Sequence, residues 1–472
     1  MAGPGTAAPS PPPPEESPRP EAEGGDLYDL TPGLVRAIVA ALEGDDLERV
    51  EALAVPLHAA DTADLLETVT PEQRAQIVDV LRPEFDPEIL AHLEEAVRDE
   101  VIERLDTREL AAAVTELDTD DAVYLIEDLD EEEQREVLAA VPAEERAALE
   151  EGLAYPENSA GRLMQRDLVA VPAYWTVGHT IDYLRTDDDL PDEFYDIFVV
   201  DPRHVPIGSV PLSRAMRTRR PVTMADIMEE ELRTIPADTD QEEVGYMFHQ
   251  YGLVSAPVVD ASGRLIGVVT VDDVVEVIEE EAEEDIMRLG GVSETDLHEP
   301  AWKTTRRRFA WLLVNLGTAI LASMVIGLFD ASIEQMVALA VLMPIVASMG
   351  GNAGTQTLTV TVRALATKDL TEANAARHIA KEGLVGVFNG VLFAIVTGVV
   401  AAVWFDNVLL GEVIAAAMIV NMVVAALAGI LVPLGLDRLG VDPAIAATVF
   451  VTTVTDVVGF FVFLGLSALV LL

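Results

Sequence analysis

The feature that most constrains this chain is an abrupt change in composition near residue 300. Residues 1–300 contain 72 acidic residues, 21 arginines and no lysine, whereas residues 301–472 contain 10 acidic and 9 basic residues. Five long apolar stretches fill the second part, at about 309–329, 335–359, 383–404, 412–434 and 443–471. Each can cross a hydrocarbon core of about 30 Å as a helix that rises about 1.5 Å per residue. The pattern predicts a multidomain membrane protein whose residues 301–472 form an all-α, five-span transmembrane domain.

Charged residues beside these stretches predict how the chain is inserted in the bilayer. All nine basic residues of the second part lie before the first stretch, between the second and third, or between the fourth and fifth. The other two connections, around 330–334 and 406–412, contain no lysine or arginine. Because short loops rich in lysine and arginine stay in the cytosol, we expect a multi-pass protein of the cell membrane. Its N-terminus should be cytosolic and its C-terminus outside.

The acidity of the first part has two explanations. The formal net charge of the chain is −52, which argues against a nucleic-acid partner because phosphate contacts need a basic surface. Acid-rich, lysine-poor surfaces are typical of proteins that work at high salt, where charges are screened. Acidity alone therefore does not identify a cation site. The chain also has no cysteine, so no disulfide or cysteine-ligated zinc is possible.

Residues 1–152 are predicted to form a tail and a helical domain. Residues 1–25 are rich in proline, glycine and glutamate, as in disordered tails. Residues 26–152 contain short amphipathic segments, several of which start at a proline followed by an acid, as at 70–72, 86–88 and 141–144. Proline and acids suit the first turn of a helix. We expect an α-helical, superhelical cytosolic domain here.

Residues 153–271 combine strands and helices in a pattern that occurs twice. A strand ending in Asp201, a turn and a strand with a central glycine recur as a strand ending in Asp260, a turn and residues 263–270. This pattern resembles the CBS motif, and two such motifs normally pair into one α/β domain. Thr270 and Asp273 match the Thr-x-x-Asp that contacts ribose in nucleotide-binding CBS domains, but an ordinary helix N-cap has the same residues. An acidic connecting helix follows over residues 272–300.

Polar residues inside the spans indicate the function. Asp456 is the one acidic residue deep in any predicted span, and no lysine or arginine lies deep enough to neutralise it. A carboxylate in a bilayer is costly unless it meets water, a partner or an ion. We favour a water-filled cation path, although a protonated Asp456 could instead bond to another helix. The glycine-rich run 350–357 either unwinds and exposes carbonyl groups or allows close helix packing. Such oxygen ligands suit Mg²⁺.

Together these pieces resemble the MgtE family of magnesium channels over nearly the whole chain beyond the tail. The resemblance rests on residues 155–164 (YPENSAGRLM), 350–356 (GGNAGTQ), 363–370 (RALATKDL), 440–444 (GVDPA) and 452–459 (TTVTDVVG). It implies a homodimer in the lipid bilayer, with the pore at the dimer axis and the connecting helix as a plug. Asp456 matches the selectivity carboxylate, and Asn352 and Gly459 match its pore-lining partners. We predict Ser348 as a further pore residue.

The resemblance also implies regulation by cytosolic Mg²⁺. Mg²⁺ bound between the acidic faces of the cytosolic domains and the plug helix would close the pore. The matching metal-binding positions are Asp120, Asp240, Glu242, Asp273, Glu276, Glu281, Glu284, Asp285 and Asp442. ATP binding to the CBS pair, through Thr270 and Asp273, is a further expectation.

The sequence favours a Mg²⁺-selective channel for magnesium uptake, and not an enzyme. No nucleophile–base pair, phosphate-binding loop or histidine cluster stands out. One alternative is a broader divalent-cation transporter that also carries Co²⁺ or Mn²⁺, because oxygen ligands do not exclude these ions. Another is a membrane-anchored metal or nucleotide sensor without transport. Asp456 and the glycine-rich second span argue against the sensor, because an anchor needs neither.

Overall fold

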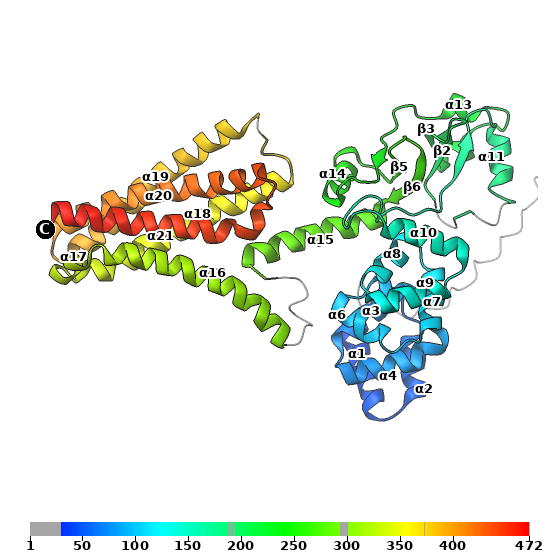
Figure 1. Ribbon diagram of the computed structural model, residues 1–472, viewed down its shortest axis with the longest axis horizontal. Coiled ribbons are helices and arrows are strands. Elements are labelled where there is room, and N and C mark those ends of the chain that lie inside the picture. Colours follow the sequence, from blue (N-terminus) through cyan, green and yellow to red (C-terminus); the bar gives the residue numbers. More distant parts are fainter. Residues whose placement is uncertain (1–29, 187–189, 192–193, 293–300, 372, 472) are drawn as a thin grey trace, which may run out of the picture. The chain divides into compact units, whose positions relative to one another are not determined.

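The computed structural model describes residues 30–186, 190–191, 194–292, 301–371 and 373–471 (Figure 1). The predicted tail, residues 1–25, and the last part of the predicted connecting segment, 293–300, lie outside the described residues. The chain divides into two compact units. One contains the helices up to Leu117 together with Tyr124–Pro142, and the other contains Asp118–Val123 together with the chain from Ala143 onward. Each unit is described by itself.

The first unit is helical, as predicted. Its elements are α1 (Pro32–Glu43), α2 (Leu47–Ala54), α3 (Ala59–Thr68), α4 (Pro71–Leu81), the 3₁₀ turn η1 (Arg82–Glu84), α5 (Glu88–Ala91), α6 (Glu95–Ile102), α7 (Thr107–Glu116) and α9 (Glu131–Ala140). Helix α8 (Thr119–Glu127) begins in the second unit and ends in the first. Thr70 caps α4 through a reciprocal capping box with Gln73, which confirms the predicted proline-marked start.

Arginines in this unit bond to acids that lie 26 to 30 residues further along the chain. Arg74 pairs with Glu100, and the buried Arg98 pairs with Asp128. The guanidinium carbon of Arg98 also lies 4.4 Å from the ring centre of Tyr124. A buried guanidinium needs such partners, because an unpaired buried charge is costly. The repeated separation indicates successive helical repeats that stack on one another.

The second unit contains two matching three-stranded sheets. In the first, β1 (Ala170–Pro172) pairs in parallel with β2 (Asp196–Val200), which pairs antiparallel with β3 (Pro206–Pro211). In the second, β4 (Ile235–Pro236), β5 (Ser255–Val259) and β6 (Leu265–Thr270) follow the same order. Both sheets have an irregularity at the end of the central strand, at Val199/Val200 and Val258/Val259. This equivalence confirms the predicted internal repeat.

The two sheets form one domain because they share buried side chains. Phe198 and Val200 of the first pack with Leu265 and Val268 of the second. The helices of this region are α10 (Ala143–Leu153), α11 (Val177–Tyr183), α12 (Leu212–Arg217), α13 (Met224–Ile227) and α14 (Gln241–Tyr251). The acidic helix α15 (Val271–Gly290) begins directly after β6 and is followed by its C-cap Gly291, whose φ is +68°. No loop therefore separates the second CBS-like unit from the connecting helix.

Five helices of the described chain are long and apolar enough to cross a membrane. They are α16 (Ala301–Gly327), α18 (Ala338–Ala366), α19 (Ala375–Trp404), α20 (Val408–Arg438) and α21 (Pro443–Val470), with the short α17 (Asp330–Gln335) between the first two. The predicted spans were too short at several ends, because helices continue into charged sequence beyond the apolar core. Helices α18, α19 and α21 all pack against α20, and α16 packs against α21 (Figure 1).

Candidate functional site

Asp456 lies in the middle of α21 and is half-buried. The neighbouring threonines do not bind it, because Thr452, Thr453 and Thr455 each donate their hydroxyl to a backbone carbonyl of their own helix. Within the described part of the chain, Asp456 has no hydrogen bond or ion pair. A carboxylate left without a partner at this depth needs water or a cation. Among the described residues, the protonated, helix-bonded alternative for Asp456 finds no acceptor.

Helix α18 presents a polar face that the rest of the chain leaves exposed. Ser348, Asn352, Thr355 and Thr359 are exposed and follow one another at intervals of three or four residues, which places them on one face. The opposite side is buried: Gly354 is so close to α20 and α21 that an added Cβ would lie 2.6 Å from Val451. A polar face at membrane depth must meet water or another chain.

The glycine-rich run does not unwind. Helix α18 continues without a break through residues 350–357, and it accommodates Pro344 as well. The expectation of exposed carbonyl groups in this run was therefore wrong. The physical reason is packing: Gly350 and Gly354 let neighbouring helices approach closely, which was the other explanation of these glycines.

Asn421 of α20 is a buried residue whose importance was not predicted. It is fully inaccessible, and its Nδ2 donates to the carbonyl of Val346 on α18 at 2.8 Å. An added Cβ at Gly350 would overlap the Asn421 amide, and one at Gly459 would lie 2.9 Å from it. Asn421 therefore joins α18, α20 and α21 at one point. The buried amide in an otherwise apolar span was the available signal. Gly459 is buried against it, and its pore-lining role stays a prediction.

The end of α15 contacts the start of α21 through charged groups. Arg288 Nη1 lies 2.5 Å from Asp442 Oδ2, and Arg288 also pairs with Glu284. Burial, then Asp442 and then Glu281 raise the pKa of Asp285 to about 6. Leu289 packs among Leu358, Val362, Ala444 and Val451 of α18 and α21. The connecting helix is thus attached to the membrane helices by a mixed apolar and ionic contact.

Two more predicted acids, Asp240 and Glu242 at the start of α14, lie near the acids at the end of α15. Gln241 Nε2 donates to Glu281 Oε1 at 2.8 Å, and Asp240 caps α14 by accepting from the Glu242 backbone. The pKa of Glu242 is raised by partial desolvation and then by Glu281 and Asp240, although Glu242 is an exposed residue. One face therefore carries Asp240, Glu242, Glu281, Glu284, Asp285 and Asp442.

A second acidic pair lies at the other end of α15. Asp120 is buried, and its Oδ1 has no hydrogen-bond partner among the described residues. Burial, followed by the charge of Asp273, raises the pKa of Asp120 well above its usual value. The pKa of Asp273 is raised to about 6, mainly by burial, and Glu276 contributes to this shift. Thr270 Oγ1 donates to Asp273 Oδ2 at 2.6 Å, so the two predicted ribose contacts bond to each other.

No ready-made metal cage is formed by these acids. Within the described ranges, no three Asp, Glu or His side chains are grouped closely enough to hold an ion. Mg²⁺ usually keeps several waters and takes few protein ligands, so acids spaced around α15 suit a hydrated ion better than direct coordination. The sequence predicted the residues but not their division into two sets.

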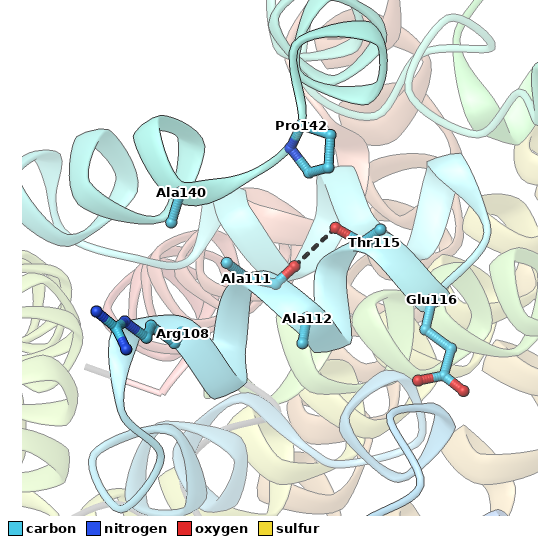
Figure 2. A pocket seen from close by; sticks show the side chains of 7 residues that line it. All are labelled: Arg108, Ala111, Ala112, Thr115, Glu116, Ala140 and Pro142. Atoms are coloured by element: carbon cyan, nitrogen blue, oxygen red, sulfur yellow. Dashed lines mark hydrogen bonds between the residues drawn. The ribbon is translucent and has the colours of Figure 1, made fainter.

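The first unit contains a shallow cavity of about 560 Å³ that includes none of the predicted residues (Figure 2). Its walls are mainly Ala111, Ala112, Ala140 and Pro142. The hydroxyl of Thr115 is already bonded to the Ala111 carbonyl at 2.8 Å. This cavity offers neither paired acids nor a phosphate-binding set, so the acids of α15 and the polar spans remain the candidate site.

Comparison with known proteins decides the family. Three family models match: a divalent cation transporter over residues 343–466, the MgtE intracellular N domain over 57–158 and the CBS domain over 224–280. The magnesium transporter MgtE of Enterococcus faecalis is 32% identical over 327 residues, which cover 69% of this chain and 72% of that protein. The chain belongs to the MgtE family.

A further relative and a solved structure are also similar to this chain. The magnesium transporter MgtE of Thermus thermophilus is 35% identical over 329 residues, covering 69% of this chain and 73% of that protein. A crystal structure of the cytosolic domain of the Mg²⁺ channel MgtE in complex with ATP matches at 28% identity and a TM-score of 0.48. That match covers 52% of this chain and 99% of the solved one. The predicted family is confirmed.

Proposed function

We propose that this MgtE-family protein conducts Mg²⁺ through a pore at the axis of a homodimer, with Asp456 as the selectivity carboxylate. Transport of Mg²⁺ follows from the family, whose relatives are magnesium transporters. The dimer, the residues of the pore and the cytosolic N-terminus are our proposals. One unpartnered Asp456 per chain is a poor site for a divalent ion, and a second copy related by a two-fold axis supplies the other charge.

The observation that carries the proposal is the exposed polar face of α18. Ser348 and Asn352 are exposed in a helix that packs against α20 and α21. Lipid offers these groups no hydrogen-bond partner, and no other helix among the described residues bonds to them. A water-filled path shared with a second copy would do so, and Mg²⁺ can cross it while keeping inner waters.

The acids around α15 support closure of the pore by cytosolic Mg²⁺. In the described structure α15 already touches the start of α21 through Arg288 and Asp442. The raised pKa of Asp285 indicates repulsion and desolvation that a bound cation would relieve. A cation that relieves repulsion only when α15 is docked shifts the population toward the docked, closed state.

Binding of ATP by the CBS pair is a separate proposal. Thr270 and Asp273 lie side by side at the start of α15, as the ribose-binding pattern requires. Their mutual hydrogen bond would have to open for ribose to enter. Titration of the purified protein with ATP, with Asp273→Asn as the comparison, tests this role independently of transport.

Mg²⁺ flux into liposomes tests the proposed pore. Asp456→Asn keeps the size of the side chain but removes its charge, so we expect flux to be lost while the protein remains folded. Asp406→Asn, at an exposed acid of the same domain, is the matched control and should conduct normally. Undiminished flux in Asp456→Asn would refute the pore role. Parallel assays with Co²⁺ and Mn²⁺ test the broader-transporter alternative.

Protease protection by Mg²⁺ tests the proposed gate. Neutralising the predicted metal-binding acids of α15 together should remove this protection. These are Asp273, Glu276, Glu281, Glu284 and Asp285. The control neutralises Glu279 and Glu283, which are exposed on the same helix. Equal protection of wild type and both variants would show that α15 acidity is a solvated surface and not a sensor.

A further inference from the structure

A polar recess lies between α18, α19 and α20, away from Asp456. Its volume is about 180 Å³. Four of its lining side chains carry oxygen atoms that can act as ligands: Gln356 and Thr357 from α18, and Glu382 and Asn389 from α19. The remaining lining residues are apolar or glycine. A hydrophobic span has no structural need for such a group of polar side chains.

Glu382 is the charged member of this group. The third span was predicted at 383–404, which begins one residue too late to include Glu382. In the structure α19 begins at Ala375, so Glu382 lies inside the helix and its side chain is only 15% exposed. Thr357 Oγ1 is 3.5 Å from Glu382 Oε2. Lys381 Nζ is 3.5 Å from Oε1, but Lys381 is 64% exposed, and such solvated pairs are weak.

Closely packed helices α19 and α20 form one side of the recess. Gly386 lines it, and an added Cβ there would lie 2.8 Å from Ala426 Cβ and 3.0 Å from the Met422 carbonyl oxygen. Helices α19 and α20 are therefore in backbone contact behind the recess. On the other side, α18 and α19 touch each other much less. The polar groups of the two helices converge where the helices separate.

The recess is on a different face of α18 from the proposed pore. Ala353, Thr357 and Val360 line it, whereas Ser348 and Asn352 belong to the exposed polar face. At 3.6 residues per turn the two faces are about a quarter to a third of a turn apart, with Gln356 between them. An ion in the recess would therefore not lie in the conduction path.

We propose that this recess binds a divalent cation through Glu382, Gln356, Thr357 and Asn389. One carboxylate, two amide oxygens and a hydroxyl are the hard oxygen ligands that such ions take. A single water needs only about 10–15 Å³ of such space, so the cavity can hold a cation together with several waters. The cation would neutralise Glu382 and bridge α18 to α19, which have few other contacts there.

Mn²⁺ and a spin label test the site without reference to transport. The native chain has no cysteine, so Val360→Cys, on the recess wall, accepts a single nitroxide. Bound Mn²⁺ should attenuate its signal with a saturable dependence on Mn²⁺ concentration. A label at Val403→Cys, near the other end of α19, is the distance control and should be affected much less.

Substitutions assign the signal to Glu382. Glu382→Gln should raise the Mn²⁺ concentration needed at least about tenfold, since even outer-shell partners of a metal contribute that much. Glu334→Gln, at an exposed glutamate of α17, should not change it. Asn389→Leu removes a proposed ligand without changing the charge, and it should also raise the Mn²⁺ concentration needed. This variant tests the site even if Glu382→Gln does not fold.

Two outcomes would overturn the proposal. One is equal Mn²⁺ dependence in Glu382→Gln and Glu334→Gln, because the attenuation would then come from the general negative surface or from lipid-bound ions. The other is loss of the effect in an Asp456→Asn background, because the ion would then be in the pore. Retention of the effect in that background, with flux lost, separates the recess site from the proposed function.

Discussion

Two adjacent glycines in α18 should respond to the same substitution in opposite ways. A Cβ added at Gly350 would overlap the amide of Asn421 and lie 3.0 Å from its Cγ, whereas one added at Gly351 has no atom within 4 Å. Asn421 cannot move aside easily, because it is fully buried and donates a 2.8 Å hydrogen bond to the Val346 carbonyl. Gly350→Ala should therefore destabilise the membrane domain, and Gly351→Ala should not.

The size of the effect follows from this packing. Overpacking of a tight interior costs about 1–3 kcal/mol, while Ala for Gly in an open helical position gains up to about 1 kcal/mol. For a domain of this size each kcal/mol shifts the melting temperature by about 2–4 °C. Thermal unfolding of the detergent-solubilised protein should place Gly350→Ala below wild type and Gly351→Ala at or above it.

A double substitution checks the cause. Asn421→Ala removes the group that Gly350→Ala would strike, so the second change should cost much less in the Asn421→Ala background than in wild type. This non-additivity is the expected sign of direct contact. The contact at Asn421 would be refuted if Gly350→Ala and Gly351→Ala were equally stable, or if the two costs simply added.

Three further predictions concern charge and capping. Arg288→Gln should weaken attachment of α15 to α21 by removing its bond to Asp442, and Arg288→Lys should restore part of the Mg²⁺-independent protease protection of residues near Gly291. Because burial and then Asp442 of α21 raise the pKa of Asp285 to about 6, the docked form binds more protons than the undocked one. Protection without Mg²⁺ should therefore rise as pH falls from 7.5 to 5.5, and less Mg²⁺ should be needed to reach the same protection; a pH-independent profile would contradict this. Thr70→Ala should cost the first unit about 1 kcal/mol in denaturant unfolding by removing the α4 cap.

Much of the architecture could be predicted from local pattern. Strands 197–200 and 265–270, the proline-marked helix starts and the five spans depend on short-range signals of burial and turn chemistry. The two-residue strand β4 (Ile235–Pro236) was missed because it is too short to show any periodicity, and only its pairing with β5 defines it.

The parts that could not be predicted depend on contacts between distant segments. Gly350 and Gly354 are compatible in sequence with an unwound helix or with close packing. Only the neighbours that the fold supplies, Asn421 of α20 beside Gly350 and Val451 of α21 beside Gly354, decide for packing. Glu382 was excluded by a span boundary set from hydropathy, although helix α19 extends beyond its apolar core. The acids on α15 were predicted as metal ligands. Only the fold shows that Asp273 lies near Asp120, whereas Asp285 lies near Asp442.

The central claim is that two copies of Asp456 face one another across a shared pore. Asp456→Cys provides the most direct measurement, because the native chain has no other cysteine. We expect an inter-chain disulfide on oxidation, or a Cd²⁺ site spanning the dimer, while Val403→Cys on the exposed side of α19 gives neither. If Asp456→Cys protein is folded and dimeric but forms neither link, the two α21 helices do not face each other and the shared pore is wrong.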